Sequence, residues 1–408
     1  MKQRQGRIWV LSEVYYPEET GVGHYATGVA EHWAIRHSVG VLAVQPSYSR
    51  AGLKAPKHEF RHGVEIFRCW AILPAGKTLL DRLLKMATVT LSLSLNAIFR
   101  VRRGDCLYVL TSPPSLAMLA PLIAWMCRVP YVIQVCDLYP EITAACGLTK
   151  TDSLSYRLLK WLSRLSLRKA AKVVVVGRDV KERISDSRSS DSVEDAIFIP
   201  WWADSEDVLP RAKAESPLAR ELGLMEKFVV LYAGNMGYPQ NVEALVEAAR
   251  RLQSDPEIHF VFLGFGSKKH LLEQLVADGA KNLTVLDVRP RDEQGDFLNA
   301  GDLGIVTLIP GMEGLGVPSR MYNLMAAGKP VLALIARDSE VAQVIREHEI
   351  GWVVEQDEIE GSVSAIRAAM ANREGLKAMA GRARAAAETR FSKKTIMESF
   401  DRLIEGLV

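Results

Sequence analysis

The sequence predicts an α/β protein made of two Rossmann-like halves, each built on a parallel β-sheet. Short apolar runs rich in β-branched residues alternate with helical patterns along the whole chain, which is typical of βα units. The length of 408 residues is enough for two or three domains. Residues 204–216 are polar, contain proline and show no periodicity, so we place the connection between the halves there.

Each half is predicted to contain five strands. Those of the first half are residues 8–11, 39–44, 106–110, 131–135 and 173–176. Those of the second half are residues 228–232, 260–263, 283–286, 303–306 and 331–334. Near the C-terminus, Ile396, Phe400 and Leu403 recur at helical spacing, so an amphipathic helix closes the chain. We therefore expect an N-terminal domain of residues 1–205, a linker of residues 206–225, a C-terminal domain of residues 226–390 and a final helix in residues 391–408.

Composition and charge exclude several classes of protein. Lys and Arg number 51 against 48 Asp and Glu, a formal net charge of +3 that is too small for a general polyanion binder. The five cysteines lie in the first 150 residues without a C-x-x-C pair, which favours a reduced, cytosolic protein without a zinc site. The apolar runs 86–99 and 116–127 are shorter than the roughly 20 residues that span a bilayer. We expect no signal peptide and no membrane crossing, although the protein can lie on a membrane.

A glycine-containing loop follows the first predicted strand and precedes a helix. Gly21, Gly23 and His24 lie there, where glycines let the backbone approach a ligand at a helix N-terminus. The spacing Gly21-x-Gly23 followed by Gly28 departs from the G-x-G-x-x-G fingerprint, which disfavours a nicotinamide-dependent enzyme. A plain βα turn with a surface histidine is the alternative.

Two more glycine loops follow strands of the second half. Gly234 and Gly237 would bring the main chain close to a phosphate, and Asn235 and Gln240 add neutral polar groups. The loop with Gly264 and Gly266 suits close packing against a base or ribose.

The segment 313–331 contains the strongest anion-binding signal. Ser319 is a plausible N-cap and Gly328 a plausible C-cap, so a short helix is expected to begin at the glycine-rich turn. This would place free backbone N–H groups and the Arg320 guanidinium together, as a diphosphate requires. The alternative is an ordinary capped helix with a surface arginine.

Two carboxylates follow the strand at residues 131–135. Asp137 and Glu141 would lie where open α/β sheets bind ligands, so one of them could orient or deprotonate an acceptor hydroxyl. The alternative is an N-cap aspartate followed by a solvated glutamate.

A basic amphipathic helix is predicted for residues 154–172. Its basic residues recur every three or four positions without a carboxylate among them: Arg157, Lys160, Arg164, Arg168 and Lys172. Together with basic residues around the apolar run 86–99, this pattern predicts docking to an anionic membrane surface. A solvated helix face is the alternative, and nucleic acid is disfavoured because interleaved aromatic residues are few.

These motifs together resemble the retaining nucleotide-sugar glycosyltransferases with the GT-B fold, the group 1 or family 4 type. The resemblance covers nearly the whole chain, and its motifs fall in family order at residues 21–23, 199–204, 232–235, 325–331 and 390–392. The variants at residues 137–141 and 318–322 look most like the branch that builds colanic acid, O-antigen and exopolysaccharide.

The resemblance implies two Rossmann-like domains whose parallel sheets face a central cleft, with the C-terminal helix crossing back to the N-terminal domain. It implies a nucleoside-diphosphate sugar donor, expected to be UDP-linked, a lipid-linked saccharide acceptor, and a location at the inner face of the cytoplasmic membrane. We expect no metal or other cofactor, because Asp-x-Asp is absent and backbone groups with an arginine can carry the diphosphate charge. The implied catalytic residues are Asp137, Arg320 and Glu313. The implied donor-binding residues are Gly234, Asn235, Gly237, Gln240, Gly264, Gly266, Gly316, Val317, Pro318, Ser319 and Asn323. The implied acceptor-side residues are Gly21, Gly23, His24 and Glu141.

The chain departs from the family pattern at three places. The usual arginine and lysine of the second glycine loop fall on Asn235 and Gln240, so Arg320 is expected to replace their charge. The usual paired glutamates fall on Leu315 and Asn323, and the usual histidine before the aspartate falls on Cys136. Two alternatives therefore stay open: a sugar-nucleotide epimerase, and a nucleotide-sugar-binding protein without catalysis.

Overall fold

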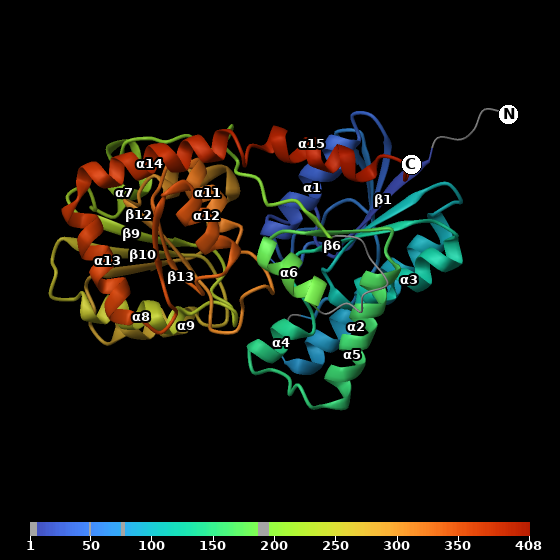
Figure 1. Ribbon diagram of the computed structural model, residues 1–408, viewed down its shortest axis with the longest axis horizontal. Helices are drawn as coiled ribbons and strands as arrows, with labels where there is room; N and C mark the ends of the chain where they lie inside the picture. The colour runs from blue at the N-terminus through green and yellow to red at the C-terminus, as the bar shows by residue number, and fades with distance from the viewer. Residues whose placement is uncertain (1–5, 49, 75–77, 187–195) are drawn as a thin grey trace. The chain divides into compact units, whose positions relative to one another are not determined.

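The computed structural model describes residues 6–48, 50–74, 78–186 and 196–408. The chain forms two compact units. Unit 1 contains residues 1–144, 149–199 and 397–408, and unit 2 contains residues 145–148 and 200–396. Each unit holds one β-sheet, which confirms the predicted pair of parallel-sheet halves (Figure 1).

Unit 1 is built on an eight-stranded sheet with the order β3-β4-β2-β1-β5-β6-β7-β8. The strands are β1 (Arg7–Leu11), β2 (Ser38–Ala43), β3 (His58–Arg61), β4 (Val64–Arg68), β5 (Cys106–Leu110), β6 (Tyr131–Val135), β7 (Lys172–Val175) and β8 (Ile197–Phe198). Only the β3–β4 pair is antiparallel among the described strands. The five strands predicted for this half are present, whereas β3, β4 and β8 were not predicted.

Helices cover both faces of this sheet. They are α1 (Gly21–Trp33), α2 (Leu79–Arg100), α3 (Pro114–Cys127), α4 (Glu141–Ala145), α5 (Leu154–Lys169), α6 (Arg178–Asp186) and α15 (Lys393–Ile404). Helices α1 and α15 lie side by side, with the rings of Trp33 and Phe400 6.0 Å apart (Figure 1). Helix α3 packs against both α2 and α5. Right-handed crossovers place these three helices on the face opposite α1.

Unit 2 is built on a fully parallel six-stranded sheet with the order β11-β10-β9-β12-β13-β14. The strands are β9 (Phe228–Ala233), β10 (Ile258–Leu263), β11 (Leu283–Leu286), β12 (Leu303–Thr307), β13 (Val331–Leu334) and β14 (Gly351–Val354). The helices are η1 (Lys213–Glu215), α7 (Pro217–Glu221), α8 (Val242–Arg251), α9 (Lys269–Ala277), η2 (Arg291–Glu293), α10 (Gln294–Leu298), α11 (Arg320–Ala326), α12 (Glu340–His348), α13 (Ile359–Ala371) and α14 (Arg373–Glu388). Phe228, Phe260 and Phe262 are fully buried in its core.

The segment predicted as a linker is folded into unit 2. Residues 206–225 contain η1 and α7, and the Ser216 hydroxyl caps α7 by accepting from the Ala219 N–H. Residues 397–408 return to unit 1, which confirms that the C-terminal helix crosses back to the N-terminal domain.

The predicted helix at residues 154–172 is too long, because α5 ends at Lys169 and Ala170 is already extended. Lys172 begins β7 instead, and its ammonium group donates to the Leu403 carbonyl at 2.6 Å. Its assignment to the basic face of that helix is therefore wrong. No helix in the described part of the chain is both long and apolar enough to cross a membrane.

Candidate functional site

The two glycine loops of unit 2 interlock at the carboxyl ends of β9 and β10. The Met236 N–H donates to the Phe265 carbonyl at 2.6 Å, and the Lys268 N–H donates to the Met236 carbonyl at 2.9 Å. Gly264 has a φ of +150°, and a Cβ atom there would lie 2.0 Å from the Gly234 carbonyl oxygen. Gly266 has a φ of +143°, and its Cβ would lie 2.3 Å from the Met236 carbonyl oxygen. The packing of one loop on the other therefore explains both glycines.

Arg320 begins α11 and joins this loop pair. Its Nη2 donates to the Asn235 carbonyl at 2.9 Å, and its guanidinium carbon lies 4.2 Å from the centre of the Tyr232 ring. The Tyr232 hydroxyl donates to the same carbonyl at 2.6 Å. A Cβ at Gly234 would lie 3.2 Å from the guanidinium group. The predicted Arg320, Gly234 and Asn235 are thus brought together.

Two polar groups in the first turn of α11 are left without a hydrogen bond in the described structure. They are the buried Nη1 of Arg320 and the Oδ1 of Asn323, whose residue is only 7% exposed. Buried polar atoms normally have partners, and exceptions are frequent where a ligand binds. Ser319 precedes the helix as predicted, but its side chain makes no capping hydrogen bond.

The other predicted donor residues surround this turn. The Gly237 N–H donates to Oε1 of Gln240 at 2.9 Å, so this glutamine first stabilises its own loop. The Val317 carbonyl accepts from the Trp201 indole N–H at 3.1 Å. Gly316 is buried, Pro318 is partly exposed beside it, and Glu313 is half-buried in the preceding loop.

Sequence reasoning missed Tyr232 and Lys268. Tyr232 lies two residues before Gly234, and burial raises the pKa of its phenol while the Arg320 charge lowers it. The Lys268 ammonium group donates to the Gln240 carbonyl at 2.9 Å and contacts Glu243 at the same distance. Tyr232 is the second-last residue of β9 and Lys268 lies in the loop after β10, so their nearness to strand ends was the available signal. Their contacts depend on how β9 and β10 lie beside each other.

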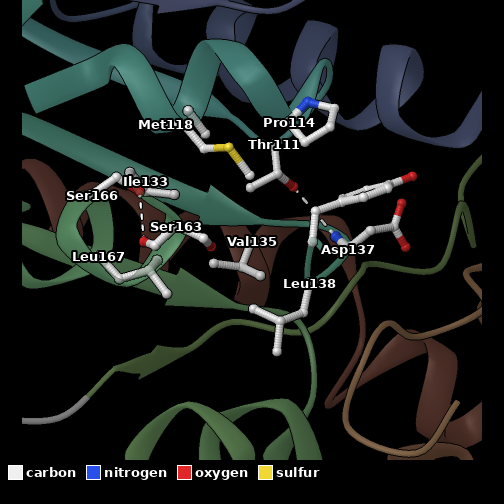
Figure 2. Close-up of a pocket in the computed structure, with 12 residues that line it drawn as sticks. Thr111, Pro114, Met118, Ile133, Val135, Asp137, Leu138, Ser163, Ser166 and Leu167 are labelled. Carbon is white, nitrogen blue, oxygen red and sulfur yellow. Dashed lines mark hydrogen bonds between the residues drawn. The ribbon is translucent and has the colours of Figure 1, made fainter. Parts of the chain in front are cut away.

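In unit 1, Asp137 follows β6 and lines a pocket beneath α3 and α5. The Thr111 hydroxyl accepts from the backbone N–H groups of Cys136 and Asp137, at 3.0 and 3.3 Å, and so fixes this turn. Figure 2 shows the carboxylate of Asp137 directed away from the apolar side chains of Met118 and Leu167 that also line the pocket. Burial raises the pKa of Asp137 to about 6. Its carboxyl group therefore changes protonation state in the range useful for acid–base chemistry.

Glu141 has a different environment from Asp137. It opens α4, and its carboxylate lies 3.4 Å from the Lys160 ammonium group. Lys160, predicted as part of the basic helix face, is thus held by an acid within unit 1.

Gly21, Gly23 and His24, predicted in a loop before a helix, instead lie in the first turn of α1. Gly21 is the first residue of the helix, and the Thr20 hydroxyl caps it by accepting from the Gly23 N–H at 3.3 Å. A Cβ at Gly23 would lie 2.7 Å from the Glu18 carbonyl oxygen. The His24 ring packs edge-on against Tyr25, with ring centres 5.3 Å apart.

A second acidic group of unit 1 was not predicted. Glu13 follows β1 and accepts from the Tyr48 hydroxyl at 3.0 Å and from the Lys85 ammonium group at 2.8 Å. Burial, followed by the Glu13 charge, raises the pKa of Tyr48 far above its usual range. Both carboxylates thus lie after the central parallel strands of this unit.

Comparison with known proteins identifies the family. Residues 217–386 match the model of glycosyl transferases group 1, and residues 20–194 match that of a glycosyl transferase 4-like domain. The chain belongs to these glycosyltransferases. The match of both halves agrees with the GT-B fold expected from the sequence.

Three similar proteins are informative. A probable glycosyltransferase of Pseudomonas aeruginosa, WbjE, is 35% identical over 62% of this glycosyltransferase, and the alignment covers 63% of WbjE, less than two thirds of its length. WcaI of Escherichia coli, a putative colanic acid biosynthesis glycosyl transferase, is 26% identical over 89% of this chain and 92% of its own. The crystal structure of Anabaena HepE with UDP-glucose superposes with a TM-score of 0.73 at 18% identity, over 98% of this chain and all of HepE, which shows the shared fold.

Proposed function

We propose that this glycosyltransferase moves a sugar, with retention of anomeric configuration, from a UDP-linked donor to a lipid-linked saccharide in the synthesis of a bacterial surface polysaccharide. The observation that carries the proposal is Arg320, whose guanidinium is held over Tyr232 and against Asn235 while its Nη1 has no partner in the described structure. A fixed, partly unsatisfied guanidinium beside two glycine loops suits a diphosphate.

The similar proteins support the choice of substrates. HepE was solved with UDP-glucose, which favours a UDP-linked donor, and WcaI is described as a colanic acid enzyme, which favours a polysaccharide product. A lipid-linked acceptor places the reaction at the inner face of the cytoplasmic membrane.

The proposed reaction breaks the bond between the anomeric carbon and the diphosphate oxygen. The bonding electron pair stays on the diphosphate, whose developing charge Arg320 stabilises. The acceptor hydroxyl oxygen forms the new glycosidic bond on the same face, and its proton passes to a leaving phosphate oxygen. The products are UDP and the extended saccharide.

Asp137 is proposed to orient the acceptor hydroxyl in unit 1. Its pKa of about 6 leaves it mainly ionised at neutral pH, so it accepts a hydrogen bond from that hydroxyl. Glu313 is proposed to contact the donor sugar. We further propose that no metal is required, because a guanidinium and backbone N–H groups can carry the diphosphate charge.

The test is product analysis with a panel of UDP-sugars and a polyprenyl-diphosphate saccharide, with and without a metal chelator. We expect a glycosylated lipid product with the donor's anomeric configuration, formed equally in the chelator. Epimerised donor formed without any acceptor would instead support an epimerase. UDP binding without any turnover would support a non-catalytic protein.

A further inference from the structure

Helix α2 exposes large apolar side chains and buries several polar ones. A stripe of large apolar residues recurs at helical spacing on its exposed side: Leu80, Leu84, Leu91, Leu95 and Phe99, together with Ala87. Leu80 is 74% exposed and Phe99 72%. The stripe extends over 20 residues, and the 19 steps between its ends correspond to about 28 Å at 1.5 Å per residue.

The opposite side of α2 is small and partly polar. Val89, Leu93 and Ala97 are buried there, but so are Thr90, Ser92 and Ser94. The Thr90 hydroxyl contacts the Ser115 hydroxyl of α3 at 2.6 Å. A helix on a water-exposed surface normally has the reverse arrangement, with its bulky apolar residues inside.

The neighbouring helices extend the apolar stripe. Helix α3 packs between α2 and α5, and it exposes Leu122, Trp125 and Met126. Helix α5 exposes Leu154, Leu158 and Trp161 at a spacing of four and three residues. Nearly half of the large hydrophobic residues that the described chain exposes lie on these three helices. We define the α2–α3–α5 face as these exposed apolar residues; exposed apolar surface gathered in this way marks an interaction site.

The exposed charges around the α2–α3–α5 face are mainly positive, with Asp152 as an exposed carboxylate just before α5. The exposed cations are Arg82 on α2, Arg102 and Arg103 after it, Arg128 after α3, and Arg157, Arg164, Arg168 and Lys169 on α5. Asp81 is the only carboxylate in the sequences of the three helices. Bulky apolar residues flanked by arginine and lysine are typical of a surface that lies in the interfacial region of an anionic bilayer.

We propose that the α2–α3–α5 face docks the protein on an anionic lipid bilayer, with the α2 stripe inserted among the lipid chains. A second copy of the chain is a poorer occupant, because a two-fold contact through this face would bring Arg157 and Arg164 toward their own equivalents. Insertion of α2 goes beyond the electrostatic docking that the basic residues of α5 alone predict. The proposal rests on the proposed function only in that a lipid-linked acceptor requires a membrane.

The test is co-sedimentation with phosphatidylethanolamine–phosphatidylglycerol vesicles and with pure phosphatidylcholine vesicles, at low salt and at about 0.5 M salt, where surface charges are largely screened. We expect the wild type to bind the anionic vesicles more tightly, and to keep part of that binding at high salt. The double variant Leu91→Gln/Leu95→Gln should bind at least tenfold more weakly at both salt concentrations. Arg157→Glu/Arg164→Glu should lose mainly the salt-sensitive part.

Two control variants test whether the loss of vesicle binding is specific to the α2–α3–α5 face. Ile35→Gln/Val276→Gln changes two exposed apolar residues outside the face, and Arg250→Glu/Arg402→Glu changes two exposed arginines outside it. Both controls should bind vesicles like the wild type. Trp125 and Trp161 are exposed, so the wild-type fluorescence should shift to shorter wavelength on vesicle binding.

Several results would overturn the proposal. One is wild-type protein that stays in the supernatant, and another is equal binding by Leu91→Gln/Leu95→Gln. A wild-type dimer that these two substitutions dissociate would assign the face to a second copy instead. UDP binding by the same variants separates this proposal from the proposed function. Weaker vesicle binding with unchanged UDP binding assigns the substituted residues to membrane docking alone. A wild type that binds vesicles but not UDP would instead contradict the proposed donor site.

Discussion

The carboxyl ends of the two sheets have opposite chemistry although both units share a parallel fold. In unit 2, the loops after β9 and β10 are rich in glycine and hold the cation Arg320. In unit 1, the turns after β1 and β6 hold the carboxylates Glu13 and Asp137. The first arrangement suits an anionic diphosphate and the second suits a hydroxyl group. The fold therefore fixes where ligands bind, and the loop residues decide which ligands they are.

The largest expected effect is that of Gly264→Ala, which tests whether the two glycine loops of unit 2 must touch. Its Cβ would lie 2.0 Å from the Gly234 carbonyl oxygen in a backbone with a φ of +150°. We expect a loss of unfolding free energy on the order of 3 kcal/mol, together with loss of UDP binding. Thermal unfolding and calorimetry measure the two effects.

Gly279→Ala is the matched control for this substitution. Gly279 has a φ of +96°, but a Cβ atom there would have no neighbour within 4 Å. It should cost only about 1 kcal/mol of backbone strain and leave UDP binding unchanged. Equal effects of the two substitutions would show that strain alone, and not contact between the loops, determines the outcome.

Asp137→Asn tests the role of the carboxylate after β6 in unit 1. Because burial raises the pKa of Asp137 to about 6 from 3.8, the folded state binds more protons than the unfolded state between these values. The unfolding free energy of the wild type should therefore fall as pH rises from about 4 to about 6 through this group. Asp137→Asn removes this pH-dependent contribution. The unfolding free energy of the variant relative to that of the wild type should therefore rise by on the order of 1–2 kcal/mol between about pH 4 and pH 6.

Thermal unfolding of both proteins at pH 4 and pH 7 measures the difference. A stability difference that does not depend on pH would mean that folding does not raise the pKa of Asp137. Activity should fall in the variant at pH 7, where the wild-type carboxyl group is mainly ionised and an amide cannot replace it as an acceptor. At pH 4 the wild-type group is mainly protonated, so the difference in activity should be much smaller.

Tyr232→Phe is expected to have the smallest effect. It removes the 2.6 Å hydrogen bond to the Asn235 carbonyl but keeps the aromatic ring under Arg320. UDP affinity should fall by about two- to tenfold, the range of one net hydrogen bond. Tyr232→Leu also removes the cation–π contact and should weaken binding further. Calorimetry with UDP compares them, and a Tyr232→Leu protein that binds as tightly as Tyr232→Phe would exclude a role for the ring.

The strands were largely predictable, because buried parallel strands are continuous β-branched runs. The edge strand β3 was missed, since it carries His58, Glu59 and Arg61 and has no apolar run. Its neighbour β4 was missed with it. The C-terminal part of the predicted basic helix was wrong because Lys172 continues the helical spacing of charges, whereas hydrogen bonding to β6 makes it a strand residue.

The candidate site was predictable only at the level of motifs. Arg320 and Gly234 could be named from glycine and arginine patterns, but the contact of Arg320 with Tyr232 arises because β9 and β12 are neighbours in the sheet. The pKa of Asp137 depends on its burial in the folded chain, which no local pattern encodes. The apolar exposed side of α2 also became visible only when its buried side was known.

The central claim is that Arg320 holds the donor diphosphate at the carboxyl end of the unit 2 sheet. The most direct measurement is calorimetric titration of the wild type, Arg320→Ala and the surface control Arg250→Ala with UDP, GDP and ADP. We predict selective binding of UDP by the wild type and the control, and an affinity at least about 30-fold lower in Arg320→Ala, as expected for a lost charge-assisted contact. UDP binding by Arg320→Ala with the affinity of the wild type would contradict this account.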